Sequence, residues 1–483
     1  MGKGTGKREV RYRKNARDAA SQANWAVPCW IMRHDRVSES LPPNLGDFDL
    51  VIVDEASQSD LVALPVLLRA QKVLIVGDDK QVSPEGVGLE EKIRHLMDQC
   101  LGNQVGIYKS VMSPERSIYD LFKTVYANNT VMLKEHFRCV HPIIEYSKRE
   151  FYNHELIPIR LPKMSERLDP PLIDVLIQDG YRAGDENIAE AKFIVAEIKK
   201  IVNDESLSSR SIGIVSLLAK QQACRIRDML IQELGSEVWD KHRIAYGGAS
   251  DFQGKERDIV FLSMVVAPNE LGAPLTRETY AQRFNVAASR ARDRMYLVRS
   301  VSIEQLSPAD KFRRSLIAHF SAPFSYNESC RKDTRELCES EFEKAVYDVL
   351  TERGYRVIPQ VQIGQLFRID MVVEGENDAR LAIECDGDQY HGPEKWEDDI
   401  ARQRMLERAG WVFWRCLAST WFRRREEMIE DLIGALSENN VYPTSSDGVV
   451  PSLYCEQRVV NTLELDIVSN NDLKETIEDS EQT

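Results

Sequence analysis

The chain has 483 residues, of which 43% are hydrophobic and 29% are charged, and its formal net charge is −14. This balance is typical of a globular protein, and the length allows two to four domains. The sequence gives no indication of membrane insertion or Sec-type secretion, because no apolar run approaches the ~20 residues that cross a bilayer and no apolar stretch follows the basic N-terminus.

The cysteines indicate the cellular compartment, and the distribution of charge indicates the character of the two ends of the chain. Nine cysteines are scattered along the chain without a C-x-x-C pair, so we expect reduced thiols, a cytoplasmic location and no structural zinc. Residues 1–25 hold seven Lys or Arg and two acidic residues, whereas residues 456–483 hold eight acidic and two basic residues. This asymmetry predicts a basic N-terminal arm that faces solvent or nucleic acid, and an acidic, disordered tail.

The first residues, MGKGTGKRE, contain a Gly-Lys pair that raises the question of a phosphate-binding loop. Such a loop reads G-x-x-x-x-G-K-[ST], because backbone N–H groups wrap the phosphates, the lysine reaches them and the hydroxyl binds Mg²⁺. Counting from Gly6, the first glycine position is Met1 and the hydroxyl position is Arg8. A second Gly-Lys pair, at 254–255, fails at the same two positions. The sequence therefore contains no phosphate loop.

Two apolar runs each end abruptly in acidic residues. FDLVIVDEASQ (48–58) and KVLIVGDDKQVSP (72–84) are typical of parallel strands buried on both faces, and ligands bind beyond the carboxyl ends of such strands. There Asp54 is placed to hold Mg²⁺, Glu55 to orient or deprotonate water, and Gln81 to sense a terminal phosphate.

Three further segments carry arginines or a glycine loop next to strand-like runs. They are LKEHFRCVHP (133–142), SDFQGKERDIVFLSMV (250–265) and RFNVAASRARDRMYLV (283–298). A guanidinium can stabilise the charge that develops during phosphoryl transfer. Together with DEASQ and GDDKQ, these segments resemble motifs II to VI of superfamily 1 helicases, in family order over about residues 48–300.

The resemblance implies RecA-like parallel sheets, an incomplete first domain (1–129) and a second domain (130–305). Only 53 residues precede Asp54, so it implies the C-terminal part of a longer helicase. We expect this chain alone to hydrolyse ATP weakly or not at all, and to use ATP only if missing N-terminal sequence or a partner chain supplies the phosphate loop. The implied nucleotide-site residues are Asp54 as Mg²⁺ ligand, Glu55 as catalytic base, Gln81 as γ-phosphate sensor, Arg138 and Arg290 as arginine fingers, and Gly254 and Glu256 in the loop that couples ATP to nucleic acid.

A second pattern follows an irregular linker (306–337). SEFEKAVYDVLTERG (340–354) has the apolar spacing of a one-sided helix, and Ser340 with Glu343 fits a capping box, which favours a structural role for Glu343. Three strand candidates, a charged helix and a fourth strand give the order αβββαβ within 338–438, before the acidic tail (439–483). The strand candidates are 355–363, 367–373, 380–387 and 411–416, and the charged helix is 396–409.

Three carboxylates interrupt this pattern at strand positions. Glu384 and Asp386 are two residues apart and therefore share a face, and Asp370 lies on the preceding strand. Converging buried carboxylates predict a bound divalent cation, which can activate water and polarise a phosphodiester. His391 follows closely. The alternative is a set of acids at an exposed sheet edge.

Asp370, the segment Glu384-Cys385-Asp386 and the αβββαβ order resemble the PD-(D/E)xK restriction-endonuclease-like fold, in particular its very-short-patch-repair-like branch. The resemblance implies that Asp370 and Glu384 bind the metal. Asp386 stands where that family has a lysine, so it is a candidate third ligand, with His391 or Lys395 activating water or holding the phosphate.

The combined interpretation is a Mg²⁺- or Mn²⁺-dependent DNA endonuclease domain fused to the rear part of a superfamily 1 helicase, acting in DNA repair or defence. Two alternatives stay open. One is a non-catalytic nucleic-acid-binding scaffold with degraded sites, and the other is an ATPase assembled with a separate chain that carries the phosphate loop. The basic run 423–425, beside two aromatic residues, is a candidate phosphate contact.

Overall fold

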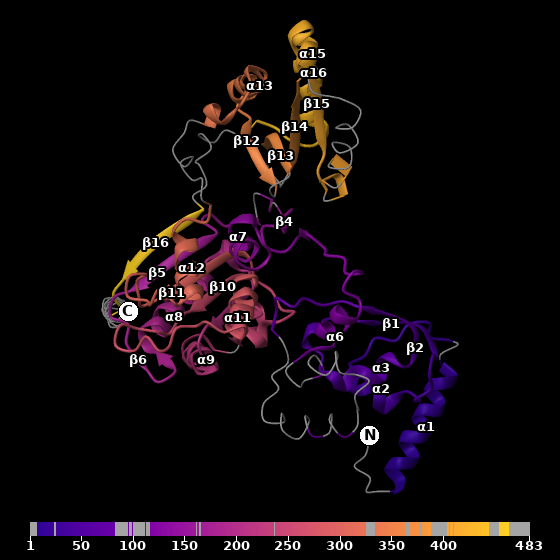
Figure 1. Cartoon of the computed structure of the whole chain (residues 1–483). Helices are drawn as coiled ribbons and strands as arrows, with labels where there is room; N and C mark the ends of the chain where they lie inside the picture. Colours follow the sequence, from indigo (N-terminus) through magenta and orange to yellow (C-terminus); the bar gives the residue numbers. More distant parts are fainter. Residues whose placement is uncertain are drawn as a thin grey trace, which may run out of the picture. The chain divides into compact units, whose positions relative to one another are not determined.

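The structure is a computed structural model, and it divides into two compact units, Met1–Met132 and Leu133–Thr483 (Figure 1). Within the described part, no helix is long and apolar enough to cross a membrane. The described residues are 7–23, 26–82, 95, 99, 112, 116–160, 162–163, 166–235, 237–324, 334–363, 367–375, 379–387, 403–404, 406–408, 410–443 and 454–462.

The first unit is built on a two-stranded parallel sheet. Its strands pair in register from Phe48 opposite Ala70 to Val53 opposite Ile75. The elements are α1 (Lys7–Ala23), α2 (His34–Ser40), β1 (Phe48–Val53), α3 (Leu64–Leu67), β2 (Ala70–Ile75) and α6 (Ile118–Val125), with single 3-10 turns at Ala56–Gln58 and Leu61–Ala63. The predicted parallel pairing of the two acid-ending strands is confirmed.

This sheet is covered on one face only, which differs from the expectation of two buried faces. Val51 and Val53 pack against a core that includes Leu67 and Ile118. The alternate residues Leu50, Ile52 and Leu74 are 48%, 58% and 49% exposed. The apolar runs predicted burial on both sides because they are continuous, but the described helices supply a cover for one side.

The second unit contains a six-stranded sheet in the order β16-β5-β11-β10-β8-β9, and every neighbouring pair is parallel. This confirms the predicted α/β class for this region. Its strands are β5 (Leu172–Ile177), β8 (Ile212–Ser216), β9 (Ala245–Gly248), β10 (Arg257–Ser263), β11 (Ala291–Arg299) and β16 (Cys455–Val460). The helices are α7 (His141–Phe151), α8 (Ile188–Asn203), α9 (Lys220–Leu234), α10 (Glu237–Lys241), α11 (Glu278–Ala288) and α12 (Lys311–Ser321), and two small sheets join β3 (Glu135–His136) to β4 (Ile157–Pro158) and β6 (Arg182–Ala183) to β7 (Glu186–Asn187).

The central strands of this sheet are buried on both faces, as continuous apolar sequence predicts. Ile212, Ile214 and Phe261 pack in one core with residues of α8 and α9. Residues that alternate with them, such as Val215 and Leu262, are equally buried. The sheet is therefore sandwiched between layers, with α7, α11 and α12 grouped together in Figure 1.

Two segments expected to be irregular belong to this sheet or its cover. Helix α12 lies inside the predicted linker, and Leu316, Ile317 and Phe320 are buried. Strand β16 lies inside the predicted disordered tail and pairs with β5 from Cys455 opposite Leu172 to Val460 opposite Ile177. The expectation of disorder followed from the acidic composition, but the CEQRVV stretch pairs with β5 and completes the edge of the sheet.

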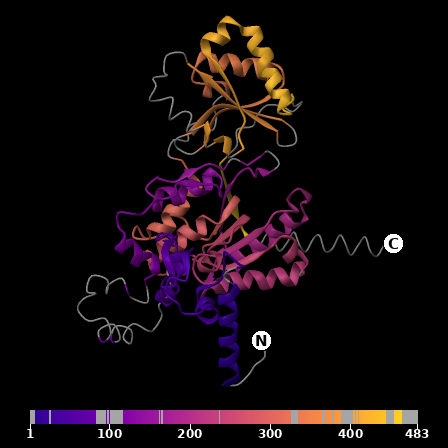
Figure 2. The ribbon, with the colours of Figure 1, turned by 90° about the vertical axis from the view of Figure 1, so that its right-hand side faces the viewer.

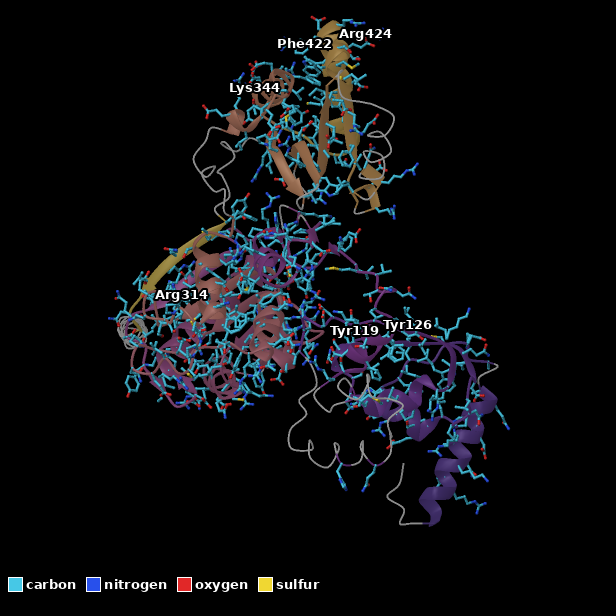
Figure 3. All side chains as sticks on the ribbon, viewed as in Figure 1. Tyr119, Tyr126, Arg314, Lys344, Phe422 and Arg424 are labelled. Atoms are coloured by element: carbon cyan, nitrogen blue, oxygen red, sulfur yellow. The ribbon has the colours of Figure 1, made fainter. Side chains whose placement is uncertain are left out.

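The four-stranded sheet of the C-terminal region follows the predicted order. Strands β12 and β13 and strands β13 and β14 are antiparallel, and β14 and β15 are parallel. Helices α13 and α16 pack on one face, where Val346, Leu432 and Trp421 share a core with Ile383 (Figure 2). The elements are α13 (Glu341–Glu352), β12 (Arg356–Ile363), β13 (Phe367–Glu374), β14 (Arg380–Asp386), β15 (Phe413–Leu417), α15 (Ala418–Arg423) and α16 (Arg425–Glu438), and most of the predicted helix 396–409 lies outside the described residues.

This smaller sheet contacts the segment that leads into β5. Ile159 is 2% exposed and packs with Val361 and Trp411 on the face opposite α13. The Arg167 guanidinium lies 2.6 Å from Glu374 Oε1. The two sheets of the second unit are thus joined by side-chain contacts as well as by the chain itself.

Candidate active sites

Asp370 lies where the hydrogen-bonded register between β13 and β14 ends. The last pair of that register is Met371 opposite Ile383. Beyond it, the backbone N–H of Cys385 donates to Asp370 Oδ2 at 2.7 Å. The Asp370 carboxylate therefore accepts a backbone hydrogen bond that a carbonyl would accept in a regular sheet. Because Cys385 lies between Glu384 and Asp386, this bond holds the carboxylate next to the segment that carries both acids.

The surroundings of Asp370 disfavour its charged form. Burial raises the pKa of Asp370 to about 6, and the charges of Glu343 and Asp386 add to the shift, while the Cys385 N–H and Arg368 oppose it. Burial and the nearby Asp370 also raise the pKa of the Cys385 thiol. A cation at this position would relieve the cost of a charged Asp370.

Glu384 and Asp386 share one face of β14. Ile383 and Cys385 pack toward the core beneath α13, so the two acids point to the other face. Glu384 is 8% exposed. Asp386 receives a fork from Arg415 on the adjacent strand, with Nε and Nη2 each 3.2 Å from a carboxylate oxygen.

The fit of a divalent cation differs among the predicted ligands. Asp370 and Glu384 supply buried oxygen donors of the kind that Mg²⁺ prefers. Asp386 is engaged by Arg415, and within the described part of the chain no three His, Cys, Asp or Glu side chains gather closely enough to hold a metal. The predicted third ligand therefore fits less well than the first two, and His391 and Lys395 lie outside the described residues.

Glu343 caps its own helix, as the capping box predicts. Its carboxylate accepts from Ser340 Oγ at 2.8 Å and from the Glu339 N–H at 3.0 Å. Gln360 Nε2 donates to the same carboxylate at 2.6 Å. Gln360 has a φ of +53° and stands opposite Asp370 in the register, between the paired residues Pro359–Met371 and Val361–Ile369. The bonded pair of Glu343 and Gln360 therefore lies near Asp370 on the α13 side.

In the first unit, the two acid-bearing turns touch each other. The N–H of Ala56 donates to the Val76 carbonyl at 2.8 Å, and a Cβ on Gly77 would come within 3.0 Å of the Ser57 nitrogen. Glu55 has a φ of +52°, and its N–H donates to Asp54 Oδ1 at 2.9 Å. This close approach places the DEAS and GDDK turns side by side at the carboxyl ends of β1 and β2.

The side chains of these turns bond within their own turns. Gln58 Nε2 donates to Glu55 Oε2, and Gln81 Nε2 donates to Asp78 Oδ2, both at 2.9 Å. Asp54 is exposed to solvent. Asp54, Glu55 and Gln81 therefore lie at one edge of the sheet, as the sequence predicts.

In the second unit, Arg138 pairs with Glu256. Arg138 Nε lies 2.6 Å from Glu256 Oε2, and Arg292 Nε lies 3.8 Å from Glu256 Oε1. Gly254, in the loop just before β10, has a φ of +71°, a conformation that glycine adopts without strain. Three of the predicted motif segments thus meet around Glu256.

His136 is hydrogen-bonded to the segment that carries Arg138. Burial, Arg138 and Arg290 lower the pKa of His136 to about 4. The neutral ring accepts through Nε2 from the Cys139 N–H at 3.0 Å. On the far side, Arg160 bonds the carbonyl of Arg138 at 3.1 Å.

Arg290 is placed differently from an exposed arginine finger. It is 1% exposed, and its Nε donates to the Val286 carbonyl at 2.9 Å. Its Nη1 reaches the Phe252 carbonyl at 3.4 Å. In this conformation Arg290 links α11 to the turn before β10. To contact a nucleotide phosphate, its guanidinium would have to break its hydrogen bonds to the Val286 and Phe252 carbonyls.

Two family models match the chain in the regions just described. Residues 115–302 match the AAA domain family, and residues 342–436 match REase_MTES_1575. The first of these regions is similar to the C-terminal part of superfamily 1 helicases, and the second is similar to restriction-endonuclease-like domains.

The helicase part has curated relatives. An uncharacterized ATP-dependent helicase of Mycoplasma genitalium is 26% identical over 290 residues, and the match covers 56% of this chain and 25% of that protein. The probable helicase senataxin of Homo sapiens is 26% identical over 268 residues, covering 52% of this chain and 9% of that protein. A solved C-terminal domain of a possible DNA helicase from Lactobacillus plantarum is 19% identical with a TM-score of 0.23, covering 38% of this chain and 96% of that one.

Sequence reasoning missed one residue of the restriction-endonuclease-like site. Arg415 contacts Asp386, but it stands in WVFWRC, where it was read only as part of a strand. The available signal was the alternation Trp414-Arg415-Cys416, which places a charged residue on the face of the strand opposite the core.

Proposed function

We propose that the restriction-endonuclease-like domain is a Mg²⁺- or Mn²⁺-dependent DNA endonuclease, fused to the rear part of an ATP-dependent superfamily 1 helicase that acts in DNA repair or in defence. The observation that carries the proposal is Asp370, a partly buried carboxylate whose pKa is raised to about 6 and whose Oδ2 bonds the β14 backbone at Cys385. Such a group is costly unless a cation or a proton compensates it.

The chain's residues have separate parts in the proposed reaction. Asp370 and Glu384 would hold the cation, which when bound lowers the pKa of a water molecule and stabilises charge on the phosphodiester. The Cys385 N–H fixes the orientation of Asp370 at 2.7 Å. Gln360 and Glu343 lie near Asp370 on the α13 side, and His391 remains a candidate for moving a proton to or from water.

The helicase part is proposed to handle nucleotide and nucleic acid. The domain division is proposed as a first RecA-like part (1–129), a second (130–305), a connection (306–337), the nuclease domain (338–438) and the C-terminal segment (439–483). The proposed nucleotide-site residues are Asp54 for Mg²⁺, Glu55 for water, Gln81 and Arg138 for the terminal phosphates, Arg290 after rearrangement, and Gly254 and Glu256 in the coupling loop. ATP use depends on a phosphate loop from further sequence or a partner chain.

DNA is the proposed substrate because a relative of the motor region from Saccharomyces cerevisiae, 24% identical over 294 residues, is described as a DNA helicase. The contacts of Ile159 and Arg167 with the nuclease sheet support a direct mechanical link between motor and nuclease. A motor that moves along DNA would then carry the cutting site with it.

The test is cleavage of supercoiled plasmid and single-stranded DNA by the full chain, with Mg²⁺, Mn²⁺ or EDTA, and with or without ATP. We expect cleavage that needs the metal, does not need ATP and is lost in Glu384→Ala. A Glu341→Ala variant, altered at an exposed side chain on the first turn of α13, is the matched control and should cut normally.

A non-catalytic scaffold that binds nucleic acid is the second candidate. It is favoured by the lack of a gathered three-carboxylate cluster in the described residues and by Asp386 at the lysine position. DNA binding by the wild type without cleavage under any of these conditions would establish it in place of the nuclease.

A further inference from the structure

Arg415 lies on the face of the sheet that carries the acids of the nuclease site. Trp414 and Cys416 pack into the core beneath α13 and α16, so Arg415, between them, points to the opposite face. In the register of β14 and β15, it stands directly beside Glu384. Its guanidinium reaches Asp386, which shares that face.

The guanidinium is held in a fixed plane from two sides. Its Nε and Nη2 each lie 3.2 Å from an oxygen of Asp386, and Nη1 donates to Gln403 Oε1 at 2.8 Å. Arginine has five N–H donors, and these bonds use three of them among the described residues. The side chain is 31% exposed, so the remaining edge is accessible to a ligand.

The site needs a cation in addition to a metal. Glu343 and Asp386 are close enough to Asp370 for their negative charges to act on it, and this negative charge repels a phosphodiester. The position two residues after Glu384 supplies a carboxylate and not a positive group. Arg368 is close enough to lower the pKa of Asp370. Both of its Nη atoms, however, donate to the carboxylate oxygens of Glu339, each at 2.6 Å.

We propose that Arg415, anchored by Asp386 and Gln403, is the phosphate-binding cation of this nuclease site and contacts the backbone of the bound polynucleotide with its outer N–H edge. Asp386 is then a positioning residue for Arg415 and not a metal ligand. The inference rests on the proposed function for the identity of the ligand, a phosphodiester.

The test is binding of a fluorescent DNA duplex to the full chain in EDTA, followed by anisotropy over a series of NaCl concentrations. Arg415→Gln should weaken binding about tenfold or more. It should also make the fall of the log association constant with log salt less steep, with a slope smaller in magnitude by about 1, the change expected for one lost phosphate contact. Arg415→Lys should keep the slope, because the charge remains. Arg353→Gln, at the far end of α13, is the control and should match the wild type.

Comparison of Arg415→Gln with Asp386→Asn separates a phosphate contact from an internal ion pair. The proposal predicts that Asp386→Asn keeps the wild-type salt slope, because Arg415 retains its charge, while Arg415→Gln reduces it. If the pair is only structural, both single variants will lower the thermal unfolding midpoint and neither will change the salt slope. That pattern would overturn the proposal.

The outcome is independent of the cleavage test. A reduced slope in Arg415→Gln with no cleavage by the wild type would retain the phosphate contact and reject the nuclease. Cleavage by the wild type with an unchanged slope in Arg415→Gln would retain the nuclease and reject this assignment.

Discussion

Arg138 and Glu256, 118 residues apart in the sequence, form an ion pair with 2.6 Å between Nε and Oε2. Their side chains are 35% and 42% exposed. A pair this accessible to water contributes little to stability, about 1 kcal/mol or less. Arg138 can therefore exchange Glu256 for a phosphate at low cost, whereas Arg290 is fixed among backbone carbonyls.

This contrast predicts different effects for the two arginines. Arg138→Ala should change the free energy of unfolding by less than about 1 kcal/mol, because water replaces an exposed partner. Arg290→Ala should lower it by about 2 to 4 kcal/mol, because the buried carbonyls of Val286 and Phe252 lose their donor. Urea unfolding of the full chain measures both. Equal losses would show that Arg290 is not anchored as described.

Asp370 gives the stability of the protein a pH dependence of known sign. Burial raises the pKa of Asp370 to about 6 in the folded state, above the 3.8 of an unperturbed aspartate. The folded state therefore holds the proton more tightly between about pH 4 and 6, and stability falls as the pH rises through that window. Asp370→Asn cannot ionise but still accepts from the Cys385 N–H, so it should remove this slope.

At pH 7 the Asp370→Asn variant should be more stable than the wild type, by about 2 to 3 kcal/mol, and at pH 4 the difference should be small. Midpoints of urea unfolding at the two pH values decide this. A variant that is less stable at pH 7 would mean that the charged form of Asp370 is favoured by its surroundings, without any cation.

Glu190 is a second buried acid and should have a purely structural effect. Burial raises the pKa of Glu190 to about 7. Ser263 Oγ, Ser300 Oγ and the Val265 N–H donate to its carboxylate at 2.7, 2.9 and 2.9 Å. Glu190→Ala leaves these donors buried and unpaired, which should cost about 3 to 5 kcal/mol.

Glu233→Ala is the matched control for Glu190, since it removes an acid from an exposed pair with Lys199. Its unfolding free energy should stay within about 1 kcal/mol of the wild type. A Glu190→Ala protein as stable as this control would show that other groups satisfy the donors.

Strand β16 should be required for the stability of the second unit. A chain ending after Pro443 loses β16 and the bond from Arg458 Nη1 to Glu197 Oε1 at 2.8 Å. It also uncovers the edge of β5, an apolar strand with unpaired backbone groups that favour association. We expect a lower thermal midpoint and self-association in light scattering, whereas a chain ending at Thr462 should behave like the full chain.

The sequence predicted the elements that carry periodic patterns. The helix that begins after Ser340, the four strands of the small sheet and the parallel pair ending at Asp54 and Gly77 follow from apolar spacing, because burial imposes that spacing. The capping role of Glu343 followed from local chemistry alone.

The sequence predicted less where partners come from distant segments. The strand role of Cys455–Val460 depends on the free edge of β5, nearly 300 residues earlier in the chain, and composition pointed to a disordered tail. The pairing of Asp386 with Arg415 depends on the register of two parallel strands. Burial of Arg290 likewise follows from tertiary contacts with Phe252, which its own segment does not reveal.

The most direct test of the central claim is the rate at which the full chain nicks supercoiled plasmid in Mg²⁺ without ATP, compared with Asp370→Asn and Arg353→Gln purified in the same way. We expect metal-dependent nicking by the wild type and by Arg353→Gln. The nicking rate of Asp370→Asn should be lower by about a hundredfold or more, because the proposed cation would lose a charged ligand. Nicking at the same rate by Asp370→Asn, or DNA binding without nicking by all three proteins, would contradict it.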